Sequence, residues 1–438
     1  MTSTNSELTV GVLSLHNSKE TKAILNAVDM LGFGTEWLRR ENTIARVQGD
    51  EFVLEPDIDV VVNRLLVSNT DQPTEALGLA CIYDGCRPVL NPPCAVLRAV
   101  HKFATASALH AEEIPIPNAI LGLDPTHLNT ARSEFANHAV YKSAIGTHGG
   151  GTWLIDTSNP VQPKVGNRQA FLQEFIKTSG NRHFDYRVYV VGENVLGAMK
   201  RTASEGEFRT NVAQGGAVED ATDDLPPNVR EMACDAMNAV GLDYAGVDIV
   251  GSPNGWYVLE VNPTAGFRGF FRSTGLNPAP YIAKLAIERV GGEVDDDRVT
   301  SLAAQLDDSM PACTPQPTQN IHREPLLIGY TERITVSGVH GSETVVAKSD
   351  TGATRTSIDL GLAAKLGVGP LKQRTRVRSG LSKTPTTRPL VDIVLGIKGD
   401  WYTVTANLTD RSHMSHPVLL GRDVLQHYAV DVTRASEE

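Results

Sequence analysis

The most informative segment of this chain for its fold is residues 245–269, AGVDIVGSPNGWYVLEVNPTAGFRG. Its two apolar runs, AGVDIV and WYVLEV, read as strands, and the intervening GSPNG is typical of a hairpin turn. With the turn centred near Asn254, Asp248 faces Glu260 across the two strands. Asn262 lies two residues beyond Glu260, so its side chain points to the same face. The stretch therefore predicts a hairpin that gathers two carboxylates and one amide.

The three side chains on this hairpin are candidate metal ligands. Neighbouring carboxylates repel each other unless a cation lies between them, because buried charges must be paired or coordinated. Carboxylate and amide oxygens suit Mg²⁺, particularly beside substrate phosphates. The alternative is a solvated hairpin whose acidic residues face water, but the flanking GVDIV and YVL segments are apolar. We expect Asp248, Glu260 and Asn262 to bind magnesium.

A glycine-rich loop and a series of cations precede the hairpin. VYKSAIGTHGGGTWLI, residues 140–155, reads as a strand carrying Lys142 and then a loop that includes Gly149 and Gly150. Glycines let backbone N–H groups approach phosphate oxygens, and the lysine supplies a point charge. Four later cations could hold phosphates or a substrate carboxylate, although each alone is more typical of a surface residue. They are Arg187, Lys200, Arg201 and Arg209.

The composition narrows the class of protein. The chain has 438 residues, too many for one compact core, and its 41% hydrophobic and 21% charged residues are typical of a globular protein. It has no run of about 18 apolar residues, and its N-terminus lacks a secretion signal. Five irregularly spaced cysteines indicate free thiols. We expect a cytoplasmic protein without a membrane partner, and a net charge of −11 argues against nucleic acid as the main partner.

Periodicity along the chain predicts three folded regions. Alternating strand and helix patterns at the start indicate an α/β layer with a parallel sheet. Strand-rich, glycine-punctuated sequence and a last helix follow, and then a segment rich in Pro, Gln, Ser and Asp reads as a linker. Short β-branched segments at the end suggest a small all-β domain. The expected boundaries are 1–100, 101–292, 293–325 for the linker, and 326–438.

An ordered series of motifs between about residues 60 and 290 resembles the RimK group of ATP-grasp ligases. The motifs are HKFATA, VYKS with GTHGGG, QEFI, DYRVYVVG, AMKR, EGEFRTN, AGVDIV and VLEVNPTAGF. Members of this group add glutamate to ribosomal protein C-termini, to a deazaflavin cofactor and to tetrahydromethanopterin. The resemblance implies a pre-ATP-grasp α/β domain at 1–100 and, at 101–292, an ATP-grasp fold in which two α+β subdomains enclose ATP.

The resemblance also implies a reaction and its cofactors. A carboxylate attacks the γ-phosphate of ATP to give an acyl phosphate, and an amine then displaces phosphate to form an amide, with ADP released. The cofactors are ATP and two Mg²⁺ ions, with Mn²⁺ as an alternative, and the metal ligands are Asp248, Glu260 and Asn262. The resemblance places Glu174 and Phe175 at the adenine hinge and Asp185 near the ribose, and it makes Arg209 catalytic as well as nucleotide-binding. The other residues that it implies for nucleotide binding are Lys102, Lys142, Gly149, Gly150, Arg187, Thr210 and Asn211.

Two departures from the glutamate-adding members lie where substrates should bind. After Asn262 this chain has PTAGFRG in place of a Ser-Ser-Pro-Gly-Leu-Glu-Gly run, and AQ (Ala213, Gln214) stands where many members have His-Arg. The exchange to Arg268 reverses a charge, which puts glutamate as the added residue in question. Arg201 and Arg268 are the candidate substrate contacts.

A second motif lies in VVAKSDTGATRTSIDL, residues 345–360. Asp350, Thr351 and Gly352 form the Asp-Thr-Gly turn of an aspartic protease, and HPVLLGRDVL supplies the apolar pair and glycine that pass behind such a turn in pepsin-like lobes. The region 327–431 resembles the RimB-type retropepsin-like domain, which is often labelled an ATP-dependent zinc protease. The sequence has no HExxH motif, so it gives the zinc label no support.

This second site needs two copies of the chain. Aspartic proteases use two aspartates that share a proton, and the sequence supplies one Asp-Thr-Gly, so we expect a homodimer or higher homo-oligomer. Asp350 acts as general acid and base on a water, Thr351 braces the turn, and RVRSGLSK (376–383) is a candidate flap. The alternative is a retropepsin-shaped module that binds or dimerises without cutting.

The leading functional hypothesis joins both regions. It is a ligase that adds an amino acid to a peptide, protein or small-molecule carboxylate, with a C-terminal peptidase-like domain that trims or reverses the modification. In one alternative the C-terminal domain only dimerises or docks substrate. In another, a nucleotide site gates a protease.

Overall fold

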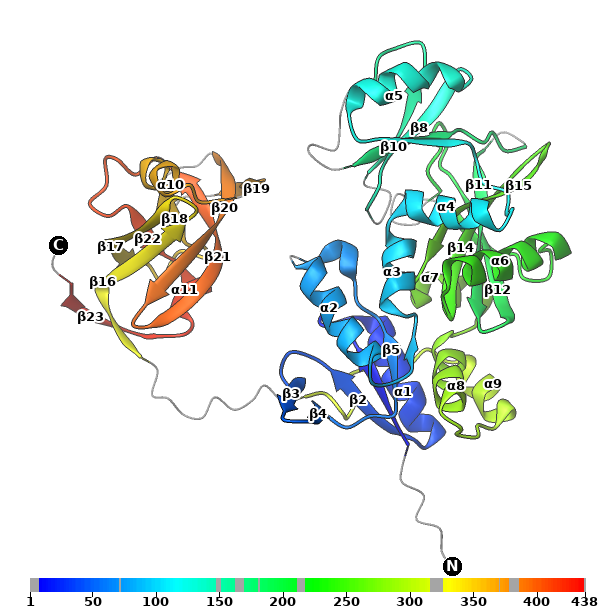
Figure 1. The fold of residues 1–438 in the computed structure, drawn as a ribbon, viewed down its shortest axis with the longest axis horizontal. Helices are drawn as coiled ribbons and strands as arrows, with labels where there is room; N and C mark the ends of the chain where they lie inside the picture. The colour runs from blue at the N-terminus through cyan, green and yellow to red at the C-terminus, as the bar shows by residue number, and fades with distance from the viewer. Residues whose placement is uncertain are drawn as a thin grey trace, which may run out of the picture. The chain divides into compact units, whose positions relative to one another are not determined.

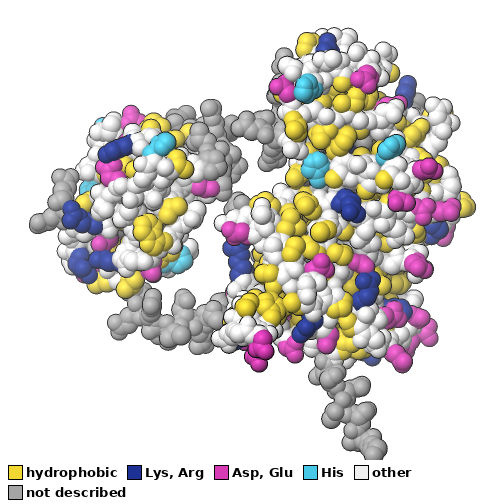
Figure 2. Space-filling model, viewed as in Figure 1, with side chains coloured by type: hydrophobic (Ala, Val, Ile, Leu, Met, Phe, Trp, Pro, Cys, Tyr) yellow, Lys and Arg dark blue, Asp and Glu magenta, His cyan; other side chains and the backbone are white. Residues whose placement is uncertain are grey.

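The computed structural model divides the chain into two compact units, residues 1–317 and 318–438 (Figure 1). It describes residues 8–70, 72–146, 151–161, 169–179, 182–210, 217–315, 326–369, 371–377 and 386–436. No helix within these ranges is long and apolar enough to cross a membrane. On the face shown in Figure 2, acidic and basic side chains are interspersed around hydrophobic ones in the first unit.

The first unit begins with a parallel sheet of order β2-β1-β5-β6, as expected for an α/β layer. The central strands are fully buried between partners on both sides, which is why they are short apolar runs. Helix α1 begins at the Ser18 cap and ends at Gly32, whose φ of 93° suits glycine. The elements are β1 (Thr9–Leu13), α1 (Lys19–Leu31), β2 (Gly34–Leu38), the hairpin β3 (Ile44–Gln48) and β4 (Glu51–Glu55), β5 (Val60–Asn63), η1 (Val67–Asn69), α2 (Pro73–Asp84) and β6 (Val89–Leu90).

Two helices lead into a second, antiparallel sheet of order β7-β10-β8-β9. Helix α5 lies against this sheet, around a small core of its own (Figure 1). The elements are α3 (Pro93–Val100), α4 (Lys102–Ala111), β7 (Ala119–Gly122), α5 (Pro125–Ala131), η2 (Arg132–Glu134), β8 (His138–Ser143), β9 (Thr152–Asp156) and β10 (Ala170–Glu174).

The third sheet has the order β13-β12-β11-β14-β15 and is antiparallel throughout. Alternate residues of β11 enter different cores: Val188 packs with helix α6, and Tyr189 packs with Phe267 and Phe270 of helix α7. The elements are β11 (Phe184–Val191), β12 (Asn194–Thr202), β13 (Ala217–Asp220), α6 (Pro227–Val240), β14 (Tyr244–Ser252), β15 (Gly255–Asn262), α7 (Phe267–Thr274) and α8 (Ala279–Arg289).

The segment expected to be a linker, 293–325, starts with a helix. Helix α9 (Asp296–Ala303) is capped by Asp295, buries Val299 and Ala303, and packs on α8 and α1. The acidic run that suggested a solvated linker is therefore the cap and first turn of a helix, where acidic groups are favourable. Residues 316–325 lie outside the described ranges.

The second unit is a curved, eight-stranded sheet of order β19-β20-β21-β18-β22-β17-β16-β23. Strand β16 also pairs with β20, which closes the sheet around an apolar core. The all-β domain expected here is thus observed. The elements are β16 (Leu327–Gly338), β17 (Gly341–Ser349), β18 (Ser357–Asp359), α10 (Leu360–Leu366), β19 (Leu371–Val377), β20 (Thr386–Ile397), β21 (Asp400–Thr409), β22 (Val418–Leu420), α11 (Arg422–Leu425) and β23 (Ala429–Ala435).

Candidate active site

The hairpin of β14 and β15 has the expected pairing at its acidic end. Asp248 pairs with Glu260, and Gly246 pairs with Asn262. The turn itself holds two residues, because Ser252 pairs with Gly255, and a bulge at Leu259 adds one residue before the acidic end. Without that bulge, Glu260 would point to the opposite face of the sheet. The bulge therefore places both carboxylates on one face.

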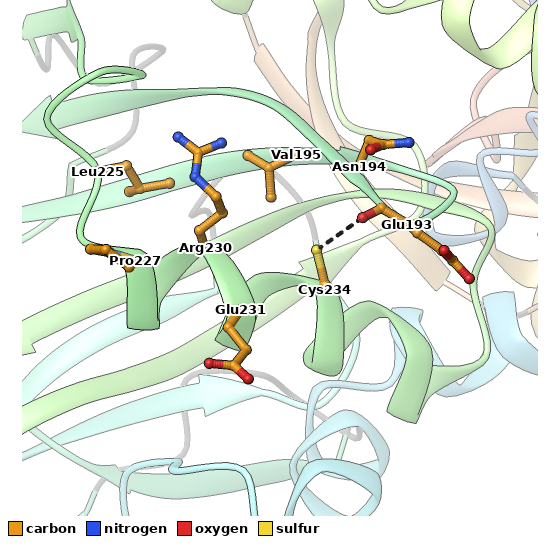
Figure 3. Close-up of a pocket in the computed structure, with 8 residues that line it drawn as sticks. All are labelled: Glu193, Asn194, Val195, Leu225, Pro227, Arg230, Glu231 and Cys234. Atoms are coloured by element: carbon orange, nitrogen blue, oxygen red, sulfur yellow. Dashed lines mark hydrogen bonds between the residues drawn. The ribbon is translucent and has the colours of Figure 1, made fainter.

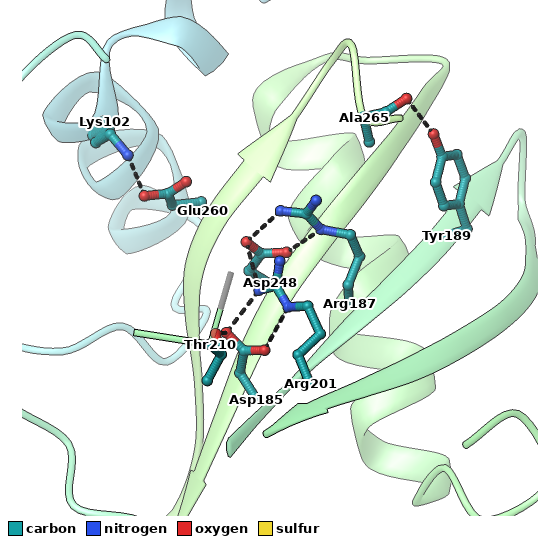
Figure 4. Close-up of polar contacts among 9 residues, drawn as sticks. All are labelled: Lys102, Asp185, Arg187, Tyr189, Arg201, Thr210, Asp248, Glu260 and Ala265. Atoms are coloured by element: carbon teal, nitrogen blue, oxygen red, sulfur yellow. Dashed lines mark hydrogen bonds and ion pairs between the residues drawn. The ribbon is translucent and has the colours of Figure 1, made fainter. Parts of the chain in front are cut away.

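Asp248 is held by two arginines, from the adjacent strand β11 and from β12 beyond it (Figure 4). Arg187 donates from Nε and Nη2 to the two carboxylate oxygens at 2.7 and 2.8 Å, and Arg201 Nη2 lies 3.0 Å from Oδ2. Burial alone would raise the pKa of Asp248, but these two cations outweigh it and hold the pKa far below its usual range. Asp248 is therefore an ionised carboxylate inside the fold.

The same network extends to Asp185. Arg201 donates from Nε and Nη2 to Asp185 at 2.7 Å each, and Thr210 Oγ1 donates to Asp185 Oδ2 at 2.7 Å. Burial opposes the charge of Arg201, yet Asp185 and Asp248 together raise its pKa. Arg201 thus links two carboxylates, and its side chain is only 3% exposed.

Glu260 is held by two lysines from distant parts of the chain. Lys102, at the start of α4, contacts Glu260 Oε1 through Nζ, and the Nζ of Lys142 on β8 lies 4.0 Å from the same oxygen. Burial lowers the pKa of Lys142 to about 8, because desolvation, together with the neighbouring Lys102 cation, outweighs the attraction of the Glu260 carboxylate. For Glu260, burial raises the pKa, but the two lysines dominate and lower it.

The donor set fits a hard divalent cation. Asp248 and Glu260 are ionised, and the amide nitrogen of Asn262 is buried without a hydrogen-bond partner in the described part of the chain, so no contact of that nitrogen fixes the orientation of the amide. The described ranges hold no cluster of three His, Cys, Asp or Glu side chains suited to a metal ion. The amide and the phosphates of a bound nucleotide would therefore have to complete the coordination.

The expected adenine-hinge residues lie at the end of strand β10, with Glu174 as its last residue and Phe175 directly after it. Glu174 Oε2 accepts from Asn118 Nδ2 at 2.9 Å, which fixes the carboxylate. Phe175 stacks on His183, with ring centroids 5.5 Å apart and planes 25° apart, and meets Phe208 edge-on. Sequence reasoning missed His183 and Phe208, because no local pattern shows that they meet Phe175. The three rings offer flat apolar surface beside the hinge.

Arg209 keeps unused hydrogen-bonding capacity. Its Nη2 lies 3.4 Å from Glu207, its guanidinium lies over the Phe208 ring, and its buried Nε has no partner within the described ranges. This arrangement leaves Arg209 able to donate to an anion. The predicted neighbours Gly149, Gly150 and Asn211, as well as Ala213 and Gln214, lie outside the described residues.

Four residues predicted to contact nucleotide or substrate form ion pairs within the fold. Both oxygens of Asp185 accept hydrogen bonds, from Arg201 and Thr210, and its contact with a ribose stays a prediction. Arg201 and Arg187 bind the carboxylates of Asp185 and Asp248. Arg268 is half-exposed and pairs with Asp308 at 2.7 and 3.2 Å. All four side chains are engaged in ion pairs between residues far apart in sequence, and such pairs cannot be recognised from the sequence alone.

The loop that follows Asn262 is anchored by two side chains that the sequence did not single out. Tyr189 donates from its hydroxyl to the carbonyl oxygen of Ala265 at 2.6 Å (Figure 4). Asn91 Nδ2 donates to the carbonyl oxygens of Tyr244 and Pro263 at 3.0 and 3.2 Å. These contacts fix the path of the chain between the candidate metal ligands and helix α7.

A separate pocket lies between α6 and the turn before β12 (Figure 3). In this pocket, Cys234 Sγ is 3.7 Å from the carbonyl oxygen of Glu193, and burial raises the pKa of the thiol. A raised pKa leaves the thiol protonated and unreactive. The pocket is lined by Glu193, Asn194, Val195, Leu225, Pro227, Arg230, Glu231 and Cys234.

In the second unit, the Asp350 turn follows strand β17. Asp350 Oδ1 accepts from the backbone N–H groups of Gly352 and Ala353 at 2.9 and 3.2 Å, and the N–H of Asp350 donates to Leu420 at 3.0 Å. Thr351 is exposed, and its hydroxyl makes no hydrogen bond within the described ranges, so the expected brace is not seen in a single chain. Of the candidate flap, 378–385 lies outside the described residues.

The apolar pair and glycine pass beside this turn as expected. Strand β22 pairs parallel to β17, so that Leu420 lies opposite Ser349. A Cβ at Gly421 would come within 2.4 Å of the carbonyl carbon of Arg355, so the two segments are in direct contact. Thr356 closes the arrangement, because its hydroxyl donates to Asp423 at 2.8 Å and accepts from Gly421 N–H at 3.1 Å.

Comparison with known proteins yields two domain matches. A model of the RimK-like ATP-grasp domain matches residues 99–286, and a model described as retropepsin-like aspartic endopeptidase RimB matches residues 368–437. The chain is 33% identical over 211 residues to the tetrahydromethanopterin:alpha-L-glutamate ligase of Methanocaldococcus jannaschii, covering 46% of this chain and 71% of that protein. It is 29% identical over 250 residues to a "Probable alpha-L-glutamate ligase" of Mannheimia succiniciproducens, covering 56% and 81%.

Solved structures share the fold of the first unit. ATP-grasp ligase PsnB, complexed with a phosphomimetic variant of its minimal precursor, Mg and ADP, aligns with 65% of this chain and 100% of its own, with a TM-score of 0.52 and 19% identity. PsnB complexed with the precursor peptide PsnA2 and AMPPNP aligns with a TM-score of 0.50 at 18% identity, covering 66% and 100%. At these identities the likeness concerns the fold.

Proposed function

The chain belongs to the RimK-like ATP-grasp family, carries a RimB-like retropepsin domain after it, and on that premise we propose that its first unit is an ADP-forming carboxylate–amine ligase. The proposed substrates are ATP with Mg²⁺, an acceptor carboxylate on a peptide, protein or small molecule, and an amino acid. L-glutamate is the first amino acid to test, because the relatives carry it in their names. Arg268 does not argue strongly against glutamate, since Asp308 already neutralises it.

The observation that carries the proposal is the set of buried charges around the hairpin. Cations from α4, β8, β11 and β12 meet carboxylates from β11, β14 and β15, and all of them are paired. A purely structural role would be better served by apolar side chains, because buried ion pairs contribute little net stability. At Glu260 a nucleotide with a divalent metal can replace the existing pairs, since phosphates take Lys102 and Lys142 and a metal takes the carboxylate.

The proposed reaction proceeds in two steps. An oxygen of the acceptor carboxylate attacks the γ-phosphorus of ATP, the bond to the bridging oxygen breaks, and ADP leaves from the acyl phosphate. The amine nitrogen then attacks the acyl carbon, the C–O bond to phosphate breaks, and the nitrogen loses a proton. Bound Mg²⁺ would supply Lewis-acid stabilisation of phosphoryl charge. Lys102, Lys142 and Arg209 hold positive charge where that negative charge develops.

The test is ADP release that depends on both acceptor and amino acid. Glu260→Ala should reduce this release by about 1,000-fold, because it removes one of two carboxylates from the proposed metal site. Glu219→Ala is the matched control, since Glu219 is exposed and pairs with Lys200 alone at 2.9 Å. A Glu260→Ala protein that keeps acceptor-dependent ADP release, with its circular dichroism spectrum unchanged, would refute the assignment.

For the second unit we propose an aspartic peptidase half-site that becomes active in a homodimer and trims or reverses the modification. The support is the Asp350 turn, whose N–H groups orient one carboxylate oxygen, and the strand β22 behind it. Asp350→Asn should abolish hydrolysis of the ligated product and leave ADP release unchanged. If product lifetime is the same in wild type and variant, the unit would instead serve to dimerise or to dock substrate.

A further inference from the structure

Arg64 is a buried cation that the proposed reaction does not yet use. It directly follows strand β5 at the carboxyl end of the parallel sheet and is only 3% exposed. Its Nε and Nη1 atoms are buried without a hydrogen-bond partner in the part of the chain that the structure describes. Burying unpaired donors of a charged group is strongly unfavourable, so a fold that keeps them has a use for them.

The guanidinium of Arg64 lies at the start of helix α7. Its Cζ is 5.2 Å from the centroid of the Phe267 ring, and Phe267 is the first residue of that helix. Gly266 occupies the cap position, and no side chain caps the helix, which leaves its first N–H groups free. An uncapped helix start carries partial positive charge and favours an anion. Two independent features thus favour an anion at the same place.

The side chains beside this anion site are those of Tyr244, Tyr189 and Glu20, and Tyr244 is in hydrogen-bond contact with Arg64. The phenols near Arg64 already donate to carbonyl oxygens, from Tyr244 to Asn63 at 2.7 Å and from Tyr189 to Ala265 at 2.6 Å. Burial raises the pKa of Tyr244 to about 12 against the opposing influence of Arg64, so the phenol stays neutral. The nearby acid is Glu20, whose Oε1 would lie 3.5 Å from a Cβ at Gly266, and it has no ion pair with Arg64 within the described ranges.

The site lies next to the proposed metal ligands. One pocket is lined by Lys102, Glu260 and Asn262 and also by Ser68 and Thr264. Ser68 belongs to η1, which follows Arg64, and Thr264 belongs to the loop that leads into α7. The pocket is therefore bounded by two of the metal ligands and by residues close in sequence to Arg64 and to the start of α7.

We propose that Arg64 and the N-terminus of α7 bind the α-carboxylate of the incoming amino acid, a site that rests on the proposed ligase function. The acceptor carboxylate must reach the γ-phosphate at Asp248, Glu260 and Asn262, so it is not the group held at Arg64. In an amino acid, one carbon separates the carboxylate from the amine. Holding the carboxylate at Arg64 therefore directs the amine along the pocket toward the acyl phosphate.

The test compares an amino acid with its α-amide. ADP release is measured with the full chain, MgATP and a panel of amino acids and their α-amides, starting with L-glutamate, and binding is measured by calorimetry with Mg²⁺ and AMPPNP. The wild type should prefer the acid by about 30-fold or more, because charge-assisted hydrogen bonds are lost with the amide. Arg64→Met should raise the KM of the acid about 30-fold, remove the preference and leave the KM of ATP unchanged.

Three controls make the outcome decisive. Arg230→Met removes a cation from the separate pocket beside α6 and should keep the preference. Retention of the MgATP-dependent thermal shift by Arg64→Met establishes that the variant folds, and Arg64→Lys, which keeps the charge, should recover part of the discrimination. A wild type that treats acid and amide alike, or an Arg64→Met protein that still discriminates, overturns the inference. A wild type that releases no ADP with any amino acid instead overturns the ligase proposal, and calorimetry then still decides whether Arg64 binds the carboxylate.

Discussion

Asp248 in the first unit lies between two arginines, whereas Asp350 in the second unit accepts hydrogen bonds from backbone N–H groups of its own turn and makes no ion pair within the described ranges. The first arrangement is complete in one chain, because strands far apart in sequence supply the opposite charges. The second presents one carboxylate, and an aspartic peptidase needs two. The first site is therefore tied to the stability of its own unit, whereas the proposed peptidase site would need a second chain to supply the other aspartate.

The largest expected effect follows from removing the charge of Asp248. Asp248→Asn leaves Arg187 and Arg201 buried without a full counter-charge, which should cost about 3–5 kcal/mol of stability in the first unit. Asp350→Asn should change the second unit by less than about 1 kcal/mol, because the amide oxygen still accepts from the same N–H groups. Hydrogen exchange of peptides from each unit measures both. Equal effects of the two substitutions would break the comparison.

The next effect concerns pH and Lys142. The pKa of about 8 means that Lys142 is a cation below pH 8 and becomes neutral above it. Phosphates bind the cation, so nucleotide affinity should fall up to about tenfold per pH unit above pH 8. Lys142→Arg keeps its charge and should flatten the profile between pH 8 and 10. Nucleotide titrations between pH 8 and 10 measure this dependence. If the nucleotide affinity of Lys142→Arg also falls with pH, the titrating group is not Lys142.

Mixing experiments give a smaller but sharper contrast. In equal mixtures of wild type and Asp350→Asn, only one dimer in four carries two native turns, so peptidase activity should fall about fourfold. In equal mixtures of wild type and Glu260→Ala, ligase activity should fall only about twofold, because each chain holds a whole ligase site. A linear loss of peptidase activity would show that one chain is sufficient for cleavage.

The smallest expected effect is at Arg268. This side chain is exposed and already paired with Asp308, so it has little capacity to select a substrate. Arg268→Ala should change the KM for L-glutamate less than about threefold, a difference that steady-state kinetics resolves against Arg64→Met. A larger change at Arg268 than at Arg64 would reverse the order of importance that the contacts imply.

Local patterns predicted the parts of the site that lie on one hairpin or one turn. The pairing of Asp248 with Glu260 was predicted from a turn centred near Asn254, and it is correct because the bulge at Leu259 makes up for a two-residue turn. The Asp350 turn with β22 beside it was likewise readable from short motifs.

Contacts between distant segments were not predictable in the same way. Three such contacts depend on how strands and loops meet in space. They are the buried ion pair of Asp185 with Arg201, the stacking of His183 on Phe175, and the hydrogen bond from Asn91 to Pro263. Helix α9 was not predicted for a related reason. Its acidic first turn is also typical of a linker, and its apolar side is recognisable only from its packing on α1 and α8. Charge patterns alone do not distinguish a solvated segment from a capped helix.

The contact of Lys102 and Lys142 with Glu260 has a consequence for the order in which ligands bind. A nucleotide that arrives without metal would draw the lysines away and leave Glu260 unpaired in a buried place. A metal ion that arrives alone would take Glu260 and leave the lysines unpaired. Each ligand thus removes the obstacle to the other, and by linkage the two must bind with positive cooperativity.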